Sequence, residues 1–93
     1  MQVSLKSNFD VAGVFSRGSV EVEEGTSLRA LLALLSERTR LSFVDPKNGQ
    51  VNATDFDIAL NGKGYQLWWP QGLDMPLKEG DEVQVLLMPL GGG

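Results

Sequence analysis

Four leucines at helical spacing, set between segments that alternate like strands, limit the folds open to this chain more than any other feature. They stand at positions i, i+3, i+4 and i+7 and form one apolar stripe: Leu28, Leu31, Leu32 and Leu35. Residues 25–27, Gly-Thr-Ser, precede the stripe and offer hydroxyl oxygens to the free amides of a first helical turn. Arg38 and Arg40 follow it, where positive charge suits the helix dipole. We therefore predict one amphipathic helix that covers a sheet.

Strand-like alternation occurs on both sides of this helix. Residues 2–7 and residues 19–23 alternate apolar and polar side chains, which predicts two neighbouring strands in an antiparallel hairpin. After the helix, residues 57–60 alternate apolar and polar or small side chains and predict a further strand that ends at the tight-turn pair Asn61-Gly62. A short fourth strand is expected at residues 65–68. Hairpin, helix and further strands together predict an α+β fold with a helix across one face of a sheet.

The last predicted strand has an apolar outer side. Val83, Val85 and Leu87 fall on one side, and the other side carries Gln84, Leu86, Met88 and Leu90. A sheet covered on one face should have polar residues on its open face. Either another part of the fold or a partner protein covers Leu86, Met88 and Leu90. We favour partner binding, because a glycine tail begins there.

Composition excludes several classes of function. The 93 residues include no cysteine and no histidine, so disulfides, thiolate nucleophiles, imidazole bases and a zinc site with such ligands are excluded, and we expect no metal. The net charge of −4 disfavours nucleic acid or an anionic membrane as a partner and suits a basic surface on another protein. A start without a signal peptide and the lack of a long apolar run predict a cytoplasmic protein.

The Trp68-Trp69 pair is unusual in so short a chain. One tryptophan could close the edge of a thin core, which is the favoured interpretation. The alternative is a binding hot spot for a partner.

The sequence ends in Gly91, Gly92 and Gly93. Three glycines make the thinnest possible peptide, about 10 Å long when extended, which can enter a narrow channel. The terminal carboxylate, with an ordinary pKa of about 3.3 to 3.7, is ionised near neutral pH and needs activation before it can react as an acyl donor. The chain has no phosphate-binding loop with which to use a nucleotide. Activation must therefore come from another protein, and we do not expect the chain to be an enzyme.

The segments LNGK and, from Pro76 to Gly93, PLKEGDEVQVLLMPLGGG carry a family resemblance. They resemble the ends of the small ubiquitin-like sulfur carriers, such as the small subunit of molybdopterin synthase and the thiamine-pathway carrier. The resemblance implies a β-grasp domain at residues 1–90, with a mixed sheet of four to five strands and one main helix, and a flexible tail at residues 91–93. The triple glycine departs from the usual terminal pair.

The resemblance also implies a mechanism. A ubiquitin-activating-like enzyme would use ATP to adenylate the carboxyl of Gly93, beside Gly92, and sulfur transfer would then give a thiocarboxylate. That group would donate sulfur to a biosynthetic enzyme such as the large subunit of molybdopterin synthase. Molybdopterin or tungstopterin biosynthesis is the first expectation, with thiamine or another sulfur-containing metabolite as the alternative, and no cofactor stays bound.

Two other interpretations stay open. A ubiquitin-like modifier would use the same adenylate for conjugation to lysines of target proteins. A simple interaction domain would carry the glycines only as a spacer or a cloning remnant.

Overall fold

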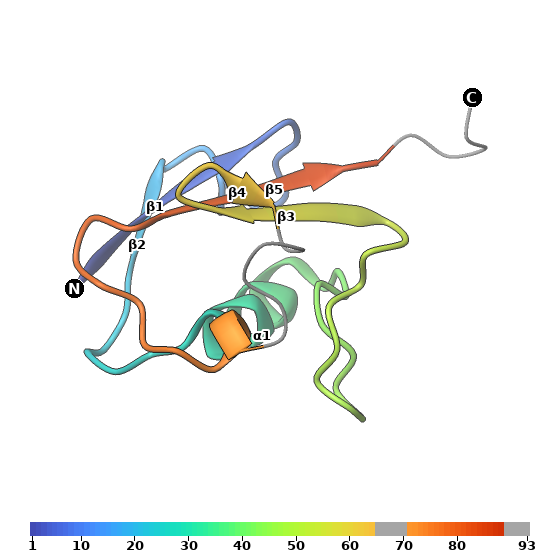
Figure 1. Ribbon diagram of the computed structural model, residues 1–93. Helices are drawn as coiled ribbons and strands as arrows, with labels where there is room; N and C mark the ends of the chain where they lie inside the picture. Colours follow the sequence, from blue (N-terminus) through green and yellow to red (C-terminus); the bar gives the residue numbers. More distant parts are fainter. Residues whose placement is uncertain (65–70, 89–93) are drawn as a thin grey trace.

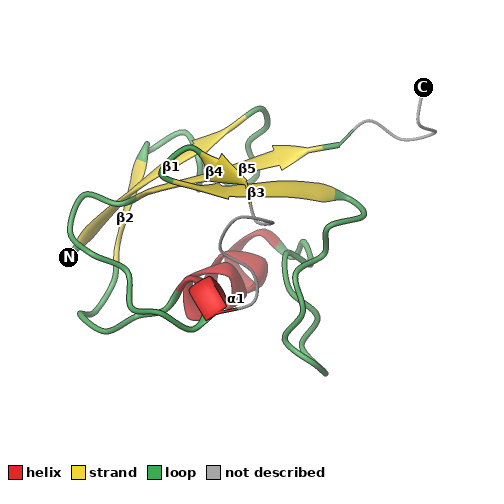
Figure 2. Ribbon diagram, viewed as in Figure 1, coloured by secondary structure: helices red, strands yellow, loops and turns green. Residues whose placement is uncertain are grey.

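The computed structural model describes residues 1–64 and 71–88, in which one helix lies against one face of a five-stranded sheet (Figures 1 and 2). In chain order the elements are β1 (Gln2–Ser7), β2 (Ser19–Glu21), α1 (Leu28–Thr39), β3 (Phe56–Leu60), β4 (Lys63–Gly64), the short 3₁₀ helix η2 (Gln71–Leu73) and β5 (Glu82–Leu87).

The strand order across the sheet is β2-β1-β5-β3-β4, so the last strand occupies the centre. The first two strands form the predicted antiparallel hairpin. Strand β5 runs parallel to β1, with Ser4 opposite Glu82 and Ser7 opposite Val85. It runs antiparallel to β3, which in turn pairs with β4. This mixed sheet with a crossing helix is a β-grasp fold and confirms the predicted fold class.

Helix α1 begins where the sequence predicts. The hydroxyl of Ser27 accepts a hydrogen bond from the amide of Ala30 at 3.1 Å, which satisfies one free donor of the first turn. The helix ends at Arg40, which has a left-handed φ of 60° and donates its amide to the carbonyl of Ser36. With 12 residues it is far too short to span a bilayer, and no other helix in the described ranges could do so.

The leucine stripe of α1 is completely buried. It packs on the covered face of the sheet, where the inward side chains are also fully or nearly fully buried: Val3, Leu5, Ile58, Val83 and Val85. Burial of each such side chain contributes about 1.5 to 3 kcal/mol. The inward side chains of β5 therefore share one core with those of both neighbouring strands and of the helix.

Four phenylalanines form one end of this core. Phe9 and Phe15 come from the β1–β2 connection, and their ring centroids lie 5.1 Å apart. Phe43 follows the helix and meets Phe56 of β3 edge to face, with centroids 4.7 Å apart. The cluster connects the loop after β1 to the segment after α1.

The turn between β3 and β4 has the predicted form. Asn61 and Gly62 have φ values of 52° and 81°, the left-handed conformation that a two-residue hairpin requires. The strand that follows is Lys63–Gly64. The strand expected at residues 65–68 lies outside the described residues, as does the Trp68-Trp69 pair.

We expect Leu32→Ala to lower the free energy of unfolding by about 2 to 5 kcal/mol, because Leu32 is fully buried and its truncation leaves a cavity. Leu34→Ala is the matched control on the same helix, since Leu34 is only partly buried, and it should cost less than about 1.5 kcal/mol. Urea titrations of both variants measure the difference. Equal losses would contradict the assigned helix face.

Candidate functional site

The candidate site is the end of β5, where the chain leaves the sheet (Figure 1). Because β5 is the central strand, its backbone is paired on both sides until it reaches this edge. Strand β1 runs in the same direction and ends at the same edge. The predicted tail, Gly91 to Gly93, follows a few residues later in the sequence.

Hydrogen bonds on two flanks hold the last described residues in place. The side-chain amide of Asn8 donates to the carbonyl of Leu87 at 3.2 Å, and its oxygen accepts from the amide of Leu87 at 2.9 Å. On the other flank, the amide of Met88 donates to the carbonyl of Asp55 at 2.8 Å. The chain is thus fixed through Met88.

The loop that carries Asn8 has its own anchor. The carboxylate of Asp10 accepts from the backbone amide of Phe15 at 2.9 Å and from that of Ser16 at 3.3 Å. These bonds, the first above all, hold the pKa of Asp10 below its ordinary value of 3.8. The carboxylate therefore keeps its charge, and its hold on the loop, down to lower pH than a free aspartate would.

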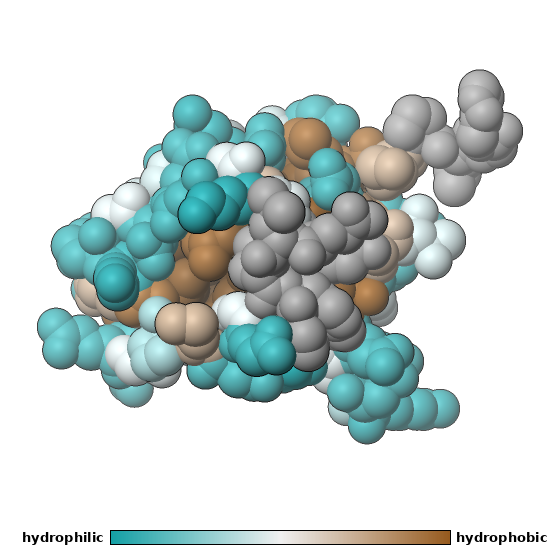
Figure 3. Space-filling model, viewed as in Figure 1, coloured by the Kyte–Doolittle hydropathy of each residue, from teal (hydrophilic) through white to brown (hydrophobic). Residues whose placement is uncertain are grey.

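A hollow of about 630 Å³ lies beside the end of β5. Its walls come from the segment after α1, the start of β3 and the end of β5: Arg40, Leu41, Ser42, Asn52, Asp55, Phe56, Leu87 and Met88. Leu87 is 47 % exposed and Met88 42 % exposed, which is high for large apolar side chains. Figure 3 shows hydrophobic colour reaching the surface at the edge where β5 ends. We call this feature the strand-end hollow.

Asn52 holds one rim of the strand-end hollow. Its side-chain amide donates to the carbonyl of Ser42 at 2.9 Å and to the carboxylate of Asp55 at 3.1 Å. The same residue accepts from the amide of Asp55 through its own side-chain oxygen. The rim therefore joins the segment after α1 to β3, and the hollow has a defined shape.

Two of the predicted partner-binding residues, Leu86 and Met88, lie within the described part of the chain. Met88 lines the strand-end hollow. Leu86 is half-buried on the open face of the sheet, opposite Asp57 of β3. The rest of that face is largely polar and includes the Lys6–Glu82 ion pair at 3.2 Å. The roles of Leu86 and Met88 in partner binding stay predictions.

The other predicted site residues are Leu90, Gly91, Gly92 and Gly93, and they lie outside the described residues. Their roles in the tail and in partner binding stay predictions.

Leu87 is a surface residue that the alternation assigned to the side of Val83 and Val85. Those two valines are fully buried, whereas Leu87 lies at the end of the strand, where the hollow opens instead of the helix. Alternation gives the side on which a residue lies but not where the covering layer ends. Only the length of α1 relative to β5 could have shown that the helix does not cover Leu87.

The strand-end hollow is suited to binding. Among residues 1–64 and 71–88, no three carboxylates are grouped closely enough to hold a metal ion. An apolar hollow with a polar rim, next to a rigid strand end, suits contact with another protein.

Comparison with known proteins supports the fold. No protein-family model matches the sequence, and no curated protein matches it significantly. Several solved structures match over nearly their whole length, including the following three. SAMP1 from Haloferax volcanii is 21% identical, with both chains fully covered and a TM-score of 0.65. The H. volcanii HVO 2177 protein is 22% identical, and the match covers 100% of this chain and 87% of that protein with a TM-score of 0.70.

The third structure is the BexX/CysO complex of Amycolatopsis orientalis, which is 18% identical, covers 98% of both chains and has a TM-score of 0.57. At these identities the similarity shows the fold. The predicted resemblance to ubiquitin-like sulfur carriers and their relatives is confirmed at that level.

We expect Asn8→Ala to lower the free energy of unfolding by about 1 to 2 kcal/mol, because two hydrogen bonds to Leu87 are lost. Amide exchange measured by NMR should speed up at Leu87. In Asn8→Asp the acceptor for that amide is kept, so Leu87 should stay protected. Unchanged exchange in Asn8→Ala would show that Asn8 does not hold the end of β5.

Proposed function

We propose that this protein is a sulfur carrier whose C-terminal carboxyl, on Gly93, is adenylated by a partner enzyme and then converted to a thiocarboxylate. The observation that supports this most is the position of β5. A central strand, held at its end by Asn8 and Asp55, leads directly toward the three glycines. A rigid body followed by a thin reactive end is what an adenylating enzyme needs to grip.

The proposed chemistry takes place on the carrier and in the active sites of its partners. A carboxylate oxygen of Gly93 would attack the α-phosphorus of ATP, forming an acyl adenylate and releasing pyrophosphate. A sulfide-equivalent nucleophile would then attack the carbonyl carbon, forming the carbon–sulfur bond as AMP leaves. The carrier is thus a substrate, and we infer that it has no catalytic activity of its own and no bound cofactor.

The partner would dock on the strand-end hollow. Ordering a peptide tail costs about 1 to 2 kcal/mol of free energy per residue, and more for glycine. Without a docking surface on the domain, contacts to the tail alone would have to offset this cost. The exposed side chains of Leu87 and Met88 provide apolar area for this next to the tail. The solved complex of BexX with CysO supports the idea that a protein of this fold works with a second protein.

The sulfur acceptor that we propose first is an enzyme of molybdopterin or tungstopterin biosynthesis, such as a molybdopterin synthase large subunit. Thiamine or another sulfur-containing metabolite is the alternative. We place the protein in the cytoplasm, where ATP is available.

A second candidate is a ubiquitin-like protein modifier. The observation in its favour is the similarity in fold to SAMP1, a small archaeal modifier protein. In this case a lysine amine of a target protein would attack the same adenylate, forming an amide bond as AMP leaves.

The intact mass of the protein from its own cells distinguishes the two candidates. We expect a species in which one oxygen is replaced by sulfur, and deletion of Gly93 should abolish it without a change in melting temperature. An isopeptide adduct on another protein would favour the modifier. An unmodified mass for a chain that ends at Gly93, in the presence of an adenylating enzyme that binds it, would contradict both, as would a cellular protein that continues beyond Gly93.

Leu87→Glu and Met88→Glu should each weaken binding of the adenylating enzyme at least tenfold, because a charge is forced into a desolvated apolar contact. Met75→Glu is the matched control, since Met75 is 61 % exposed but does not line the hollow. Leu86→Glu tests the open face of the sheet. Isothermal titration with each variant, alongside its melting temperature, measures the effect; a loss only in Leu86→Glu would move the docking surface to the open face.

A further inference from the structure

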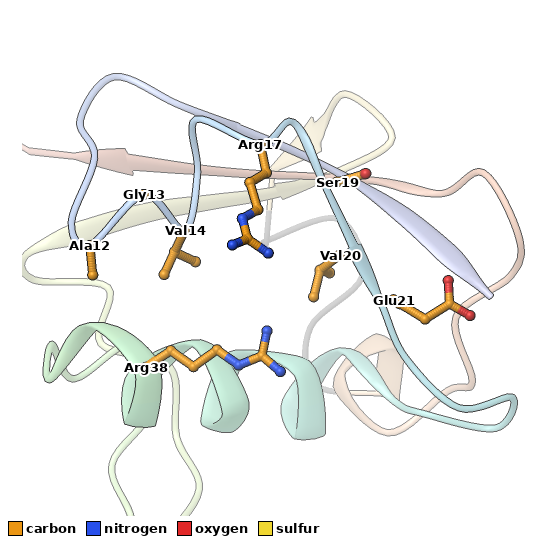
Figure 4. Close-up of a pocket in the computed structure, with 8 residues that line it drawn as sticks. All are labelled: Ala12, Gly13, Val14, Arg17, Ser19, Val20, Glu21 and Arg38. Carbon is orange, nitrogen blue, oxygen red and sulfur yellow. The ribbon is translucent and has the colours of Figure 1, made fainter.

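A second hollow lies at the β2 edge of the sheet, between β2 and α1 (Figure 4). Its volume is about 520 Å³. The β1–β2 connection, β2 and the last turns of the helix provide its walls: Ala12, Gly13, Val14, Arg17, Ser19, Val20, Glu21 and Arg38. It shares no residue with the strand-end hollow.

Two guanidinium groups face each other across this hollow. Arg17 reaches in from the connection before β2, and Arg38 reaches up from the helix (Figure 4). Within the described part of the chain, neither guanidinium makes an ion pair or a side-chain hydrogen bond. Like charges that point at one another repel, and an anion between them removes that repulsion.

The nearby carboxylates do not neutralise this pair. Glu21 accepts from the amino group of Met1 at 3.0 Å and from the side chain of Gln2, and its carboxylate points away from the hollow (Figure 4). Asp10 is occupied by two backbone amides of its own loop. Although the chain has a net charge of −4, this hollow therefore keeps two cationic groups that no described carboxylate neutralises.

The wall of this hollow includes apolar side chains beside the polar ones. Val20 is 7% exposed and forms part of the wall, with Ala12 and Val14 on the side of the connection. Ala12 and Gly13 both have left-handed φ values, 56° and 73°, which turn the connection around the mouth of the hollow. Such a conformation is uncommon for alanine, so the shape of this loop is imposed by its surroundings.

We propose that this hollow binds a small organic anion, with a carboxylate or phosphate group held between Arg17 and Arg38 and a compact apolar group against Val14 and Val20. Guanidinium forks match both oxyanions and form strong charge-assisted hydrogen bonds with them. The volume lies within the range of about 300 to 1,000 Å³ typical of small-molecule sites. A concave site whose wall includes Val14 and Val20 favours a small molecule over the flat acidic surface of a protein. The site does not depend on the proposed function.

Titration of the ¹⁵N-labelled full chain with phenyl phosphate, benzoate and inorganic phosphate, followed by NMR, tests this site. We expect phenyl phosphate or benzoate to shift the amides of Gly13, Val14 and Val20 in a saturable way. Inorganic phosphate should bind at least several-fold more weakly than phenyl phosphate, because it has no apolar group to pack against Val14 and Val20. The better of the two organic probes distinguishes a phosphate from a carboxylate ligand.

Arg17→Gln and Arg38→Gln should each weaken binding of the better probe at least tenfold, since each removes a charge-assisted contact. Lys47→Gln is the matched control, because it removes one positive charge from an exposed loop that does not line this hollow. The affinity of this variant for the probe should stay within about twofold of that of the unchanged protein. Shifts spread over the whole surface, equal affinity in all three variants, no saturable binding of either organic probe, or binding of an acidic peptide alone would each overturn the proposal.

Discussion

The parallel pairing of β1 with β5 is the interaction on which the rest of the structure depends. It joins residues 4–7 to residues 82–85, almost the whole length of the chain apart. The pairing makes β5 the central strand, so that Val83 and Val85 are buried beneath the helix. Because parallel strands end at the same edge, it also brings Asn8, just after β1, within reach of Leu87.

The connection between β1 and β2 serves both candidate sites. At its start, Asn8 holds the end of β5, and near its end Arg17 reaches into the second hollow. The carboxylate of Asp10 and the tilted contact between the rings of Phe9 and Phe15 hold the middle of the loop in place. An irregular segment positions side chains accurately only when it is anchored in this way, because each free residue of a loop gains conformational entropy.

The two hollows differ in chemistry as well as in place. The strand-end hollow exposes Leu87 and Met88 next to the tail and suits an apolar contact with a large partner. The second hollow has a mixed polar and apolar wall and two guanidinium groups that make no ion pair among the described residues, which suits a charged ligand of limited size. In the described ranges, neither hollow holds a group of three carboxylates that could bind a metal ion.

The sequence by itself determined the local elements: the helix with its Ser27 cap, the first hairpin, the Asn61-Gly62 turn and the buried leucine stripe. These depend on contacts between residues a few positions apart, which leave a periodic pattern. It also supplied the glycine end on which the proposed function depends. Only the tertiary structure decided that β5 lies at the centre of the sheet, that Leu87 is exposed and lines the strand-end hollow while Leu86 does not, and that Arg17 faces Arg38. Those outcomes depend on where distant segments meet and where the covering layer stops, and no spacing in one chain records either.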